Sequence, residues 1–127
     1  MTPCVMQDFT KLRAWQHGHQ LALEVVGALP VGRCRGLPGL RAQAIRAAMA
    51  IPANLAEGCG KASPIELAHY VDIACGSVLE LDAHLRLAQG ARLLPLEEYA
   101  VLAASVERLR KMLIALARAV RVRAAEP

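Results

Sequence analysis

The chain has 127 residues, of which 55% are apolar, 20% are charged and 3% are aromatic, and its formal net charge is +4. A chain of this length buries roughly two thirds of the surface that its unfolded form exposes, so it can hold a core without disulfides or a metal. Ala and Leu are abundant while aromatic residues are few, which favours helix over sheet and leaves little with which to line a ligand pocket. We therefore expect an all-α protein with no cofactor and no small-molecule substrate.

The cysteines and the hydropathy pattern indicate where the protein resides. The spacing of Cys4, Cys34, Cys59 and Cys75 forms no CxxC pair, so we interpret them as free thiols in a reducing compartment. No apolar run approaches the roughly 20 residues of a membrane span, and the N-terminus lacks the basic start and apolar stretch of a signal peptide. The expected location is the cytoplasm.

Two helices are predicted in the first half of the chain. The first covers about residues 10–29 with Thr10 as its N-cap, and the second covers about 39–58 with Gly58 as its C-cap and a local kink at Pro52. Spacings of three and four predict the buried face of the first helix: Leu12, Trp15, His19, Ala22, Val26 and Leu29. The same rhythm predicts the buried face of the second: Leu40, Ala44, Ala47, Ile51 and Asn54.

Two further helices are predicted over about residues 64–89 and 95–121. Ser63 is the expected N-cap of the third helix, with Glu66 placed to reach back as in a capping box. Both helices repeat apolar residues at alternating spacings of four and three, which suits antiparallel packing at shallow angles. The interpretation is a single domain over 1–127, an up-down antiparallel four-helix bundle.

Apolar residues also occur off the main stripes of the third and fourth helices. A small bundle that faces water on every side does not need them, so we expect a second apolar face that forms a subunit interface. The alternative is ordinary surface leucine in an apolar-rich chain. The residues of this second apolar face are Ile73, Leu79, Leu87, Leu93, Leu96, Met112 and Ile114.

No group of residues indicates catalysis. The segment 58–63 superficially resembles a phosphate loop, but it lacks the required spacing and connects two helices. His17 and His19 point to different sides of one helix and the other two histidines lie on another, so no metal site is expected. No cysteine has a base at helical spacing. We therefore expect no catalytic residues and no enzyme activity.

One polar group is expected to fix the register of the second and third helices. We predict that Arg46 contacts Glu80, with Gly76 allowing close approach of the two helices. Buried, mutually satisfied polar groups explain this set better than a catalytic role. Its members are Gln43, Arg46, Asn54, Glu57, Ser77 and Glu80.

Arginines are frequent near the end of the fourth helix, where no acid occurs between Arg108 and Arg123. One reading is that these cations simply complement the helix dipole, with Glu97 and Glu98 at the other end. The other is a nucleic-acid surface, to which each copy in a symmetric assembly would add its charge. The sequence alone leaves both open.

Several strings of residues together carry a family resemblance. They include GLRAQ at 39–43, RAAMAIPANLAEG at 46–58 and ACGSVLEL at 74–81. The pattern spans about residues 8–117 and resembles the four-helix-bundle family named for the 23S ribosomal RNA intervening-sequence protein. The chain departs from it at Ile45, where the family typically has a further arginine, and at Ala50, where it has serine.

The resemblance implies a small cytosolic bacterial protein without known enzymatic activity, assembled as a ring-shaped homopentamer. It also implies similarity to the accessory protein of diversity-generating retroelements, which uses a basic surface to work with nucleic acid and a reverse transcriptase. Fold transfers between relatives more securely than function.

Our first hypothesis is a non-enzymatic homo-oligomer that binds RNA or a ribonucleoprotein. The alternative is a protein-interaction scaffold, for example an accessory subunit for a reverse transcriptase, with no direct nucleic-acid binding. Neither hypothesis involves a membrane, a metal or a cofactor. The expected nucleic-acid-binding residues are Arg33, Arg35, Arg41, Arg108, Arg110, Lys111, Arg118, Arg121 and Arg123.

Overall fold

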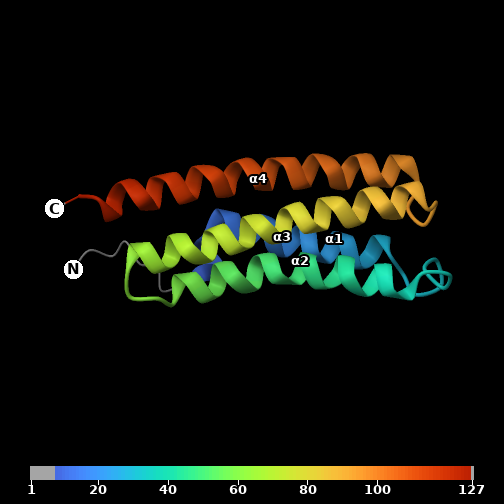
Figure 1. Cartoon of the computed structure of the whole chain (residues 1–127), viewed down its shortest axis with the longest axis horizontal. Coiled ribbons are helices and arrows are strands. Elements are labelled where there is room, and N and C mark those ends of the chain that lie inside the picture. Colours follow the sequence, from blue (N-terminus) through green and yellow to red (C-terminus); the bar gives the residue numbers. More distant parts are fainter. Residues whose placement is uncertain (1–7, 127) are drawn as a thin grey trace.

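The computed structural model describes residues 8–126, which form helices and no strand (Figure 1). The elements are η1 (Phe9–Lys11, a short 3-10 helix), α1 (Arg13–Ala28), α2 (Pro38–Cys59), α3 (Pro64–Gly90) and α4 (Leu96–Ala124). Each long helix begins and ends within three residues of the bounds expected from the sequence. In the described part of the chain, no helix combines the length and apolarity that crossing a membrane requires.

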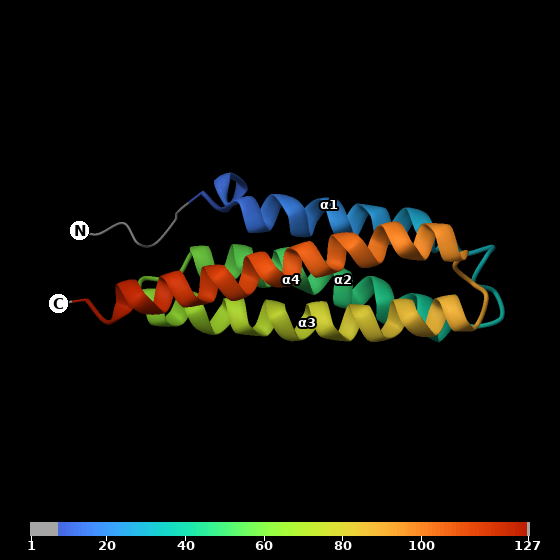
Figure 2. The same ribbon diagram turned by 90° about the horizontal axis from the view of Figure 1, so that it is seen from above.

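The four long helices pack side by side in the order of the sequence. Each contacts the next, and α4 returns to contact α1, so that the bundle closes. Both ends of the chain lie at the same end of the bundle (Figure 1), and the helices run alongside one another at shallow angles (Figure 2). The predicted up-down antiparallel four-helix bundle is confirmed.

The start of α3 follows the predicted capping box. The Ser63 hydroxyl accepts a hydrogen bond from the backbone N–H of Glu66 at 3.2 Å and donates to the Glu66 carboxylate at 3.2 Å. The start of α1 differs from the prediction. Asp8 accepts from the backbone N–H of Thr10 at 3.0 Å and caps η1, and α1 begins only at Arg13. Thr10 therefore lies inside a capped 3-10 turn and is not the N-cap of α1.

Helix α2 continues through Pro52 and ends at Cys59, with Gly60 as its C-cap. The prediction that Gly58 caps this helix is wrong, because Gly58 is buried in the last turn. A Cβ at Gly58 would lie 2.8 Å from the Cβ of Tyr70 and 3.0 Å from the nearest methyl of Leu67. Glycine is required at this position because α3 passes too close for any side chain.

The core is built from the predicted stripes of the last two helices. In α3 the whole stripe is buried: Leu67, Val71, Ala74, Val78, Leu81, Leu85 and Ala88. The predicted stripe of α4 is Tyr99, Leu102, Val106, Leu109, Leu113, Leu116 and Val120, of which Tyr99 and Leu116 are half-buried against the core and the other five are buried. The spacing of apolar residues therefore sufficed for these two helices.

In α1 the predicted buried face is only partly confirmed: Leu29 is buried, Leu12, Trp15 and Ala22 are half-buried and pack against the core, and His19 and Val26 are exposed. The stripe that faces the core is Ala14, Gly18, Leu21 and Val25, one position away from the bulkier stripe that was expected. A Cβ at Gly18 would lie 3.1 Å from Ile51 Cγ2, so small side chains here let α1 approach α2 closely. The bulkier stripe, which includes Trp15 and Val26, lies along the outer groove between these helices.

Candidate nucleic-acid interface

Part of the basic surface expected on α4 is paired with carboxylates of the same chain. Arg110 donates hydrogen bonds to Glu107 at 2.8 and 2.9 Å, and Lys111 lies 4.0 Å from the same carboxylate. Arg121 reaches across to Asp72 of α3. The Arg110 hydrogen bond holds the pKa of the Glu107 carboxyl below its usual value. These three cations share two carboxylates, so two of their three charges are offset within the chain.

Two arginines, Arg33 of the α1–α2 connection and Arg41 of the first turn of α2, bond to the C-terminal end of α1. Arg33 bonds the Ala28 carbonyl at 2.9 Å and pairs with Glu98 of α4 at 3.0 Å. Arg41 donates from its Nε to the Leu29 carbonyl at 2.7 Å. Carbonyls at a helix C-terminus lack partners within the helix, so both arginines satisfy groups that would otherwise be orphaned. Their positions are explained by the fold without a nucleic acid.

The other four expected residues are exposed and make no ion pair among residues 8–126. They are Arg35, Arg108, Arg118 and Arg123. Arg35 lies in the α1–α2 connection, at the opposite end of the bundle from the C-terminus of α4 (Figure 1). The structure therefore does not bring the predicted basic residues into one patch on a single chain. The arginines of α4 that make no ion pair are fewer than the sequence predicted, and they are spread between Arg108 and Arg123.

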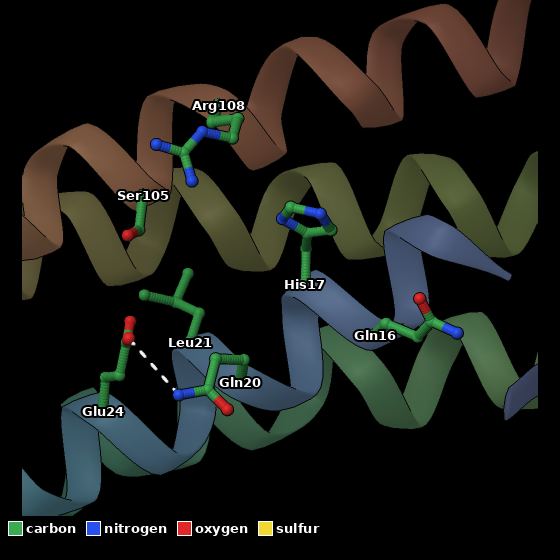
Figure 3. A pocket seen from close by; sticks show the side chains of 7 residues that line it. All are labelled: Gln16, His17, Gln20, Leu21, Glu24, Ser105 and Arg108. Carbon is green, nitrogen blue, oxygen red and sulfur yellow. Dashed lines mark hydrogen bonds between the residues drawn. The ribbon is translucent and has the colours of Figure 1, made fainter.

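One of them, Arg108, faces a hollow between α1 and α4 of about 290 Å³. His17 rises from α1 toward α4, and Ser105 and Arg108 come from α4 on the other side (Figure 3). Gln20 donates a hydrogen bond to Glu24 at 3.4 Å, which holds these two α1 side chains together below Ser105 (Figure 3). The residues lining the hollow are Gln16, His17, Gln20, Leu21, Glu24, Ser105 and Arg108.

Sequence reasoning missed His17 and Ser105 as members of a surface site. The available signal was the polar series Gln16, Gln20 and Glu24 at a spacing of four, which places three polar side chains along one side of α1. The predicted apolar stripe of α1 places His17 on the side away from the core. With the observed stripe facing the core, His17 lies on the side of α1 that faces α4.

The predicted contact between Arg46 and Glu80 is wrong. Both side chains are exposed and no ion pair joins them, although α2 and α3 pack closely. Glu80 lies 3.4 Å from His84 Nε2 instead, one turn along α3, in a geometry that leaves this buried nitrogen without a hydrogen bond from the described residues. Gly76 is also exposed, with nothing within 4 Å of an added Cβ, so it does not mediate the close approach.

The remaining members of the expected polar group are satisfied locally or exposed. Asn54 donates at 2.8 Å to a carbonyl one turn earlier in α2, and Glu57 pairs with Lys61 at 3.3 Å. Ser77 is the buried member, and Gln43 is exposed. The six residues thus do not form the mutually bonded, buried group that was expected.

The apolar surface has two parts. Of the second apolar face, Ile73, Leu79, Leu87, Leu96 and Ile114 are exposed, whereas Leu93 and Met112 pack against the core. A separate apolar groove of about 440 Å³ runs between α1 and α2, and it was not expected. Its lining includes Trp15, His19, Leu23, Met49 and Pro52.

The histidines and cysteines do not converge on a chemical site in the described residues. His19 stacks on Trp15 at 4.8 Å between ring centroids, away from His17, as the helical spacing predicted. Cys34 and Cys59 are buried, and burial raises the pKa values of the Cys59 and half-buried Cys75 thiols. A raised pKa disfavours the reactive thiolate at neutral pH. Cys4 lies outside the described residues.

Comparison with known proteins agrees with the fold. No individual curated protein matches the chain significantly. The model of one protein family, described as 23S rRNA-intervening sequence protein, matches residues 10–115, which include most of the bundle. The chain therefore belongs to the 23S rRNA-intervening sequence protein family.

Proposed function

We propose that this protein is a non-enzymatic bundle that assembles with copies of itself in the cytoplasm and binds RNA or a ribonucleoprotein. The observation that carries the proposal is the series Arg108, Arg118 and Arg123, which make no ion pair with a carboxylate among residues 8–126. Nucleic-acid affinity depends mainly on cations that can replace the counterions of phosphates. A cation already held by a carboxylate serves this purpose less well.

Self-association would strengthen RNA binding, because each copy of the chain adds its own arginine series to the assembly. The exposed leucines and isoleucines of α3 and α4, together with the α1–α2 groove, provide two different apolar surfaces on one chain. Contacts between two different surfaces repeat head to tail and close into a ring when the rotation allows it. A homopentamer, as the family resemblance implies, would carry five copies of the arginine series.

A specific observation favours the second candidate function, a protein-interaction scaffold. Arg33, Arg110, Lys111 and Arg121 are all paired within the chain, so much of the formal basic charge is structural. An accessory subunit for a reverse transcriptase, without direct contact to nucleic acid, would need only the apolar surfaces.

Salt-dependent RNA binding separates the two functions. Fluorescence anisotropy of a labelled single-stranded RNA of mixed sequence is measured over a salt series for the full chain. Replacing Arg108, Arg118 and Arg123 with Gln is expected to weaken binding at least tenfold and to reduce the salt slope by about 2, since each single-strand phosphate contact contributes about 0.7.

The control variant removes three charges elsewhere, by replacing Arg46, Arg86 and Arg92 with Gln. It is expected to change affinity by less than about threefold, because only the general field is altered. Equal losses in both variants would show that net charge alone attracts the RNA. Absence of binding at the lowest salt would contradict the RNA-binding function and favour the protein-interaction scaffold.

A further inference from the structure

We propose that the hollow between α1 and α4 is a binding site for one phosphate group, with Arg108 as its anchor and His17 and Ser105 as additional donors. The inference rests on the proposed function in one respect, because the backbone of RNA is then the source of the phosphate. A free phosphate or nucleoside monophosphate is the other source of the same chemistry.

Arg108 has the charge and geometry that this site requires. A guanidinium is always protonated and presents a planar fork of N–H donors that matches two phosphate oxygens. Two residues further along α4, Arg110 is occupied by Glu107, on the side that faces α3. Arg108 lies toward α1 instead and has no carboxylate partner among residues 8–126.

Two further hydrogen-bond donors line the same hollow, one from α1 and one from α4. Ser105 lies one turn before Arg108 on α4, and His17 projects toward them from α1 (Figure 3). Neither side chain makes a hydrogen bond to the described part of the protein. An imidazole donates at least one N–H in either protonation state, and a hydroxyl can always donate. A phosphate here would bridge the two helices.

Contacts within the protein hold several lining residues of the hollow in place without a ligand. The Gln16 amide donates to the Thr10 carbonyl at 2.9 Å, which anchors one wall to η1. Leu21 forms the floor and is only 2% exposed, so the site lies against low-dielectric core. Charge–charge attraction is stronger beside such a floor than on a fully solvated surface.

Glu24 limits what the site can hold. Its carboxylate, bonded by Gln20, lies on the same side of the hollow as Ser105 (Figure 3), so it repels a second negative group and leaves the space between Arg108 and His17 for one phosphate. The volume of about 290 Å³ is at the lower end of small-molecule pockets, which hold about 300–1,000 Å³. A single phosphodiester fits these limits better than a polyphosphate.

Inorganic phosphate is the first probe. Nuclear magnetic resonance spectra of the full chain are recorded during a phosphate titration at fixed pH and ionic strength, with chloride as the balancing anion. We expect saturable shifts of the His17 imidazole and Arg108 Nε–H signals. Arg108→Gln is expected to abolish the His17 shift and Arg108→Lys to weaken it. Arg86→Gln removes the same formal charge elsewhere, from an arginine paired with Asp82 at 3.0 Å, and is expected to leave the shift unchanged.

The second arm uses the labelled RNA. Arg108→Gln is expected to weaken RNA binding about fivefold to tenfold and to reduce the salt slope by about 0.7, the value for one phosphate. Arg86→Gln is expected to change the affinity by less than about twofold. Far-ultraviolet circular dichroism confirms that each variant keeps its helices, which is expected because both arginines are exposed.

The outcomes distinguish the two proposals. If phosphate produces no saturable shift at His17, the phosphate site is wrong, even if RNA still binds through Arg118 and Arg123. If phosphate shifts His17 but RNA does not bind, the site stands with a free phosphate as its ligand and the proposed RNA function fails. If RNA binds equally to wild type and Arg108→Gln, RNA does not use this site.

Discussion

The contact of α2 with α3 and the contact of α1 with α4 are built in opposite ways. The first is the most extensive contact in the bundle, and Gly58 lets the two backbones approach until no Cβ would fit. The second is the least extensive contact between neighbouring long helices, and two hollows lie along it, of which the one beside Arg108 is lined mainly by polar side chains and the one beside Val101 has a mostly apolar surface. Close packing excludes partners, whereas an open, polar contact leaves side chains available to them.

This difference places the tightest packing and the proposed phosphate site in different parts of one small fold. The tightly packed half holds its helices mainly with buried alanine, glycine and leucine. The open half holds Arg108, His17 and Ser105 in place without using their donors. The following predictions test whether the two halves differ energetically as they do in geometry.

The largest expected effect is that of a cavity in the closed half. Leu55 is fully buried in α2, and Leu55→Ala is expected to lower the free energy of unfolding by about 3–5 kcal/mol. Leu21, beneath the α1–α4 hollow, is the matched position, and Leu21→Ala is expected to lower it by only about 2–3 kcal/mol because water and side chains can move in. Urea unfolding at one protein concentration measures both, and equal values would contradict the comparison.

A smaller effect comes from adding one methyl group. Gly58→Ala is expected to lower the free energy of unfolding by about 1–3 kcal/mol, because the new Cβ would lie 2.8 Å from that of Tyr70. Gly27 lies in α1 at the open contact with nothing within 4 Å, so Gly27→Ala is expected to raise stability by up to about 0.5–1 kcal/mol. Thermal unfolding followed by circular dichroism gives the signs, and destabilisation by both substitutions would remove the distinction.

The ion pair between Arg33 and Glu98, at the open contact, is expected to contribute modestly to the free energy of unfolding. Arg33→Gln removes the link from α1 to Glu98 of α4 and is expected to lower the free energy of unfolding by about 1 kcal/mol, an effect that salt reduces. Arg110→Gln, which removes an exposed pair within α4, is the control and is expected to change the free energy of unfolding by less than Arg33→Gln does. A larger loss for Arg110→Gln would mean that Arg33 does not hold the two helices together.

The smallest effect is one of pH. The Arg110 hydrogen bond keeps the pKa of Glu107 in the folded state below its value in the unfolded state. The pair therefore stabilises the fold fully at pH values above the unfolded-state pKa. This stabilisation is lost as the pH falls through the folded-state pKa. Because Glu107 is exposed, the change in stability is slight. A side-chain carboxyl titration by nuclear magnetic resonance is expected to show the pKa rising in Arg110→Gln; an unchanged pKa would contradict the assignment.

Much of the fold could be predicted because local signals and packing agree. Ser63 and Glu66 mark the start of α3, and regular spacing placed the core residues of α3 and α4. In α1 two adjacent stripes compete, and the sequence favoured the one with Trp15. The core took the smaller stripe around Gly18 because only small residues allow α1 to approach Ile51.

The surface was harder to predict because pairing depends on neighbours from other helices. The stretch from Arg108 to Arg123 contains no acid, yet Arg110 pairs with Glu107 just before it and Arg121 pairs with Asp72 of α3. Arg46 and Glu80 failed to pair because both lie on outward sides of closely packed helices. A charge pattern along one helix therefore overestimates the cations that a partner can use.

Sedimentation velocity of the full chain with labelled RNA tests most directly the claim that the protein assembles and binds RNA. At low salt, the protein is expected to sediment as an oligomer at micromolar concentration and to carry the RNA with it. Raising the salt should release the RNA and leave the oligomer, because its apolar contacts are screened little by ions. A monomer that leaves the RNA sedimenting alone would contradict the account.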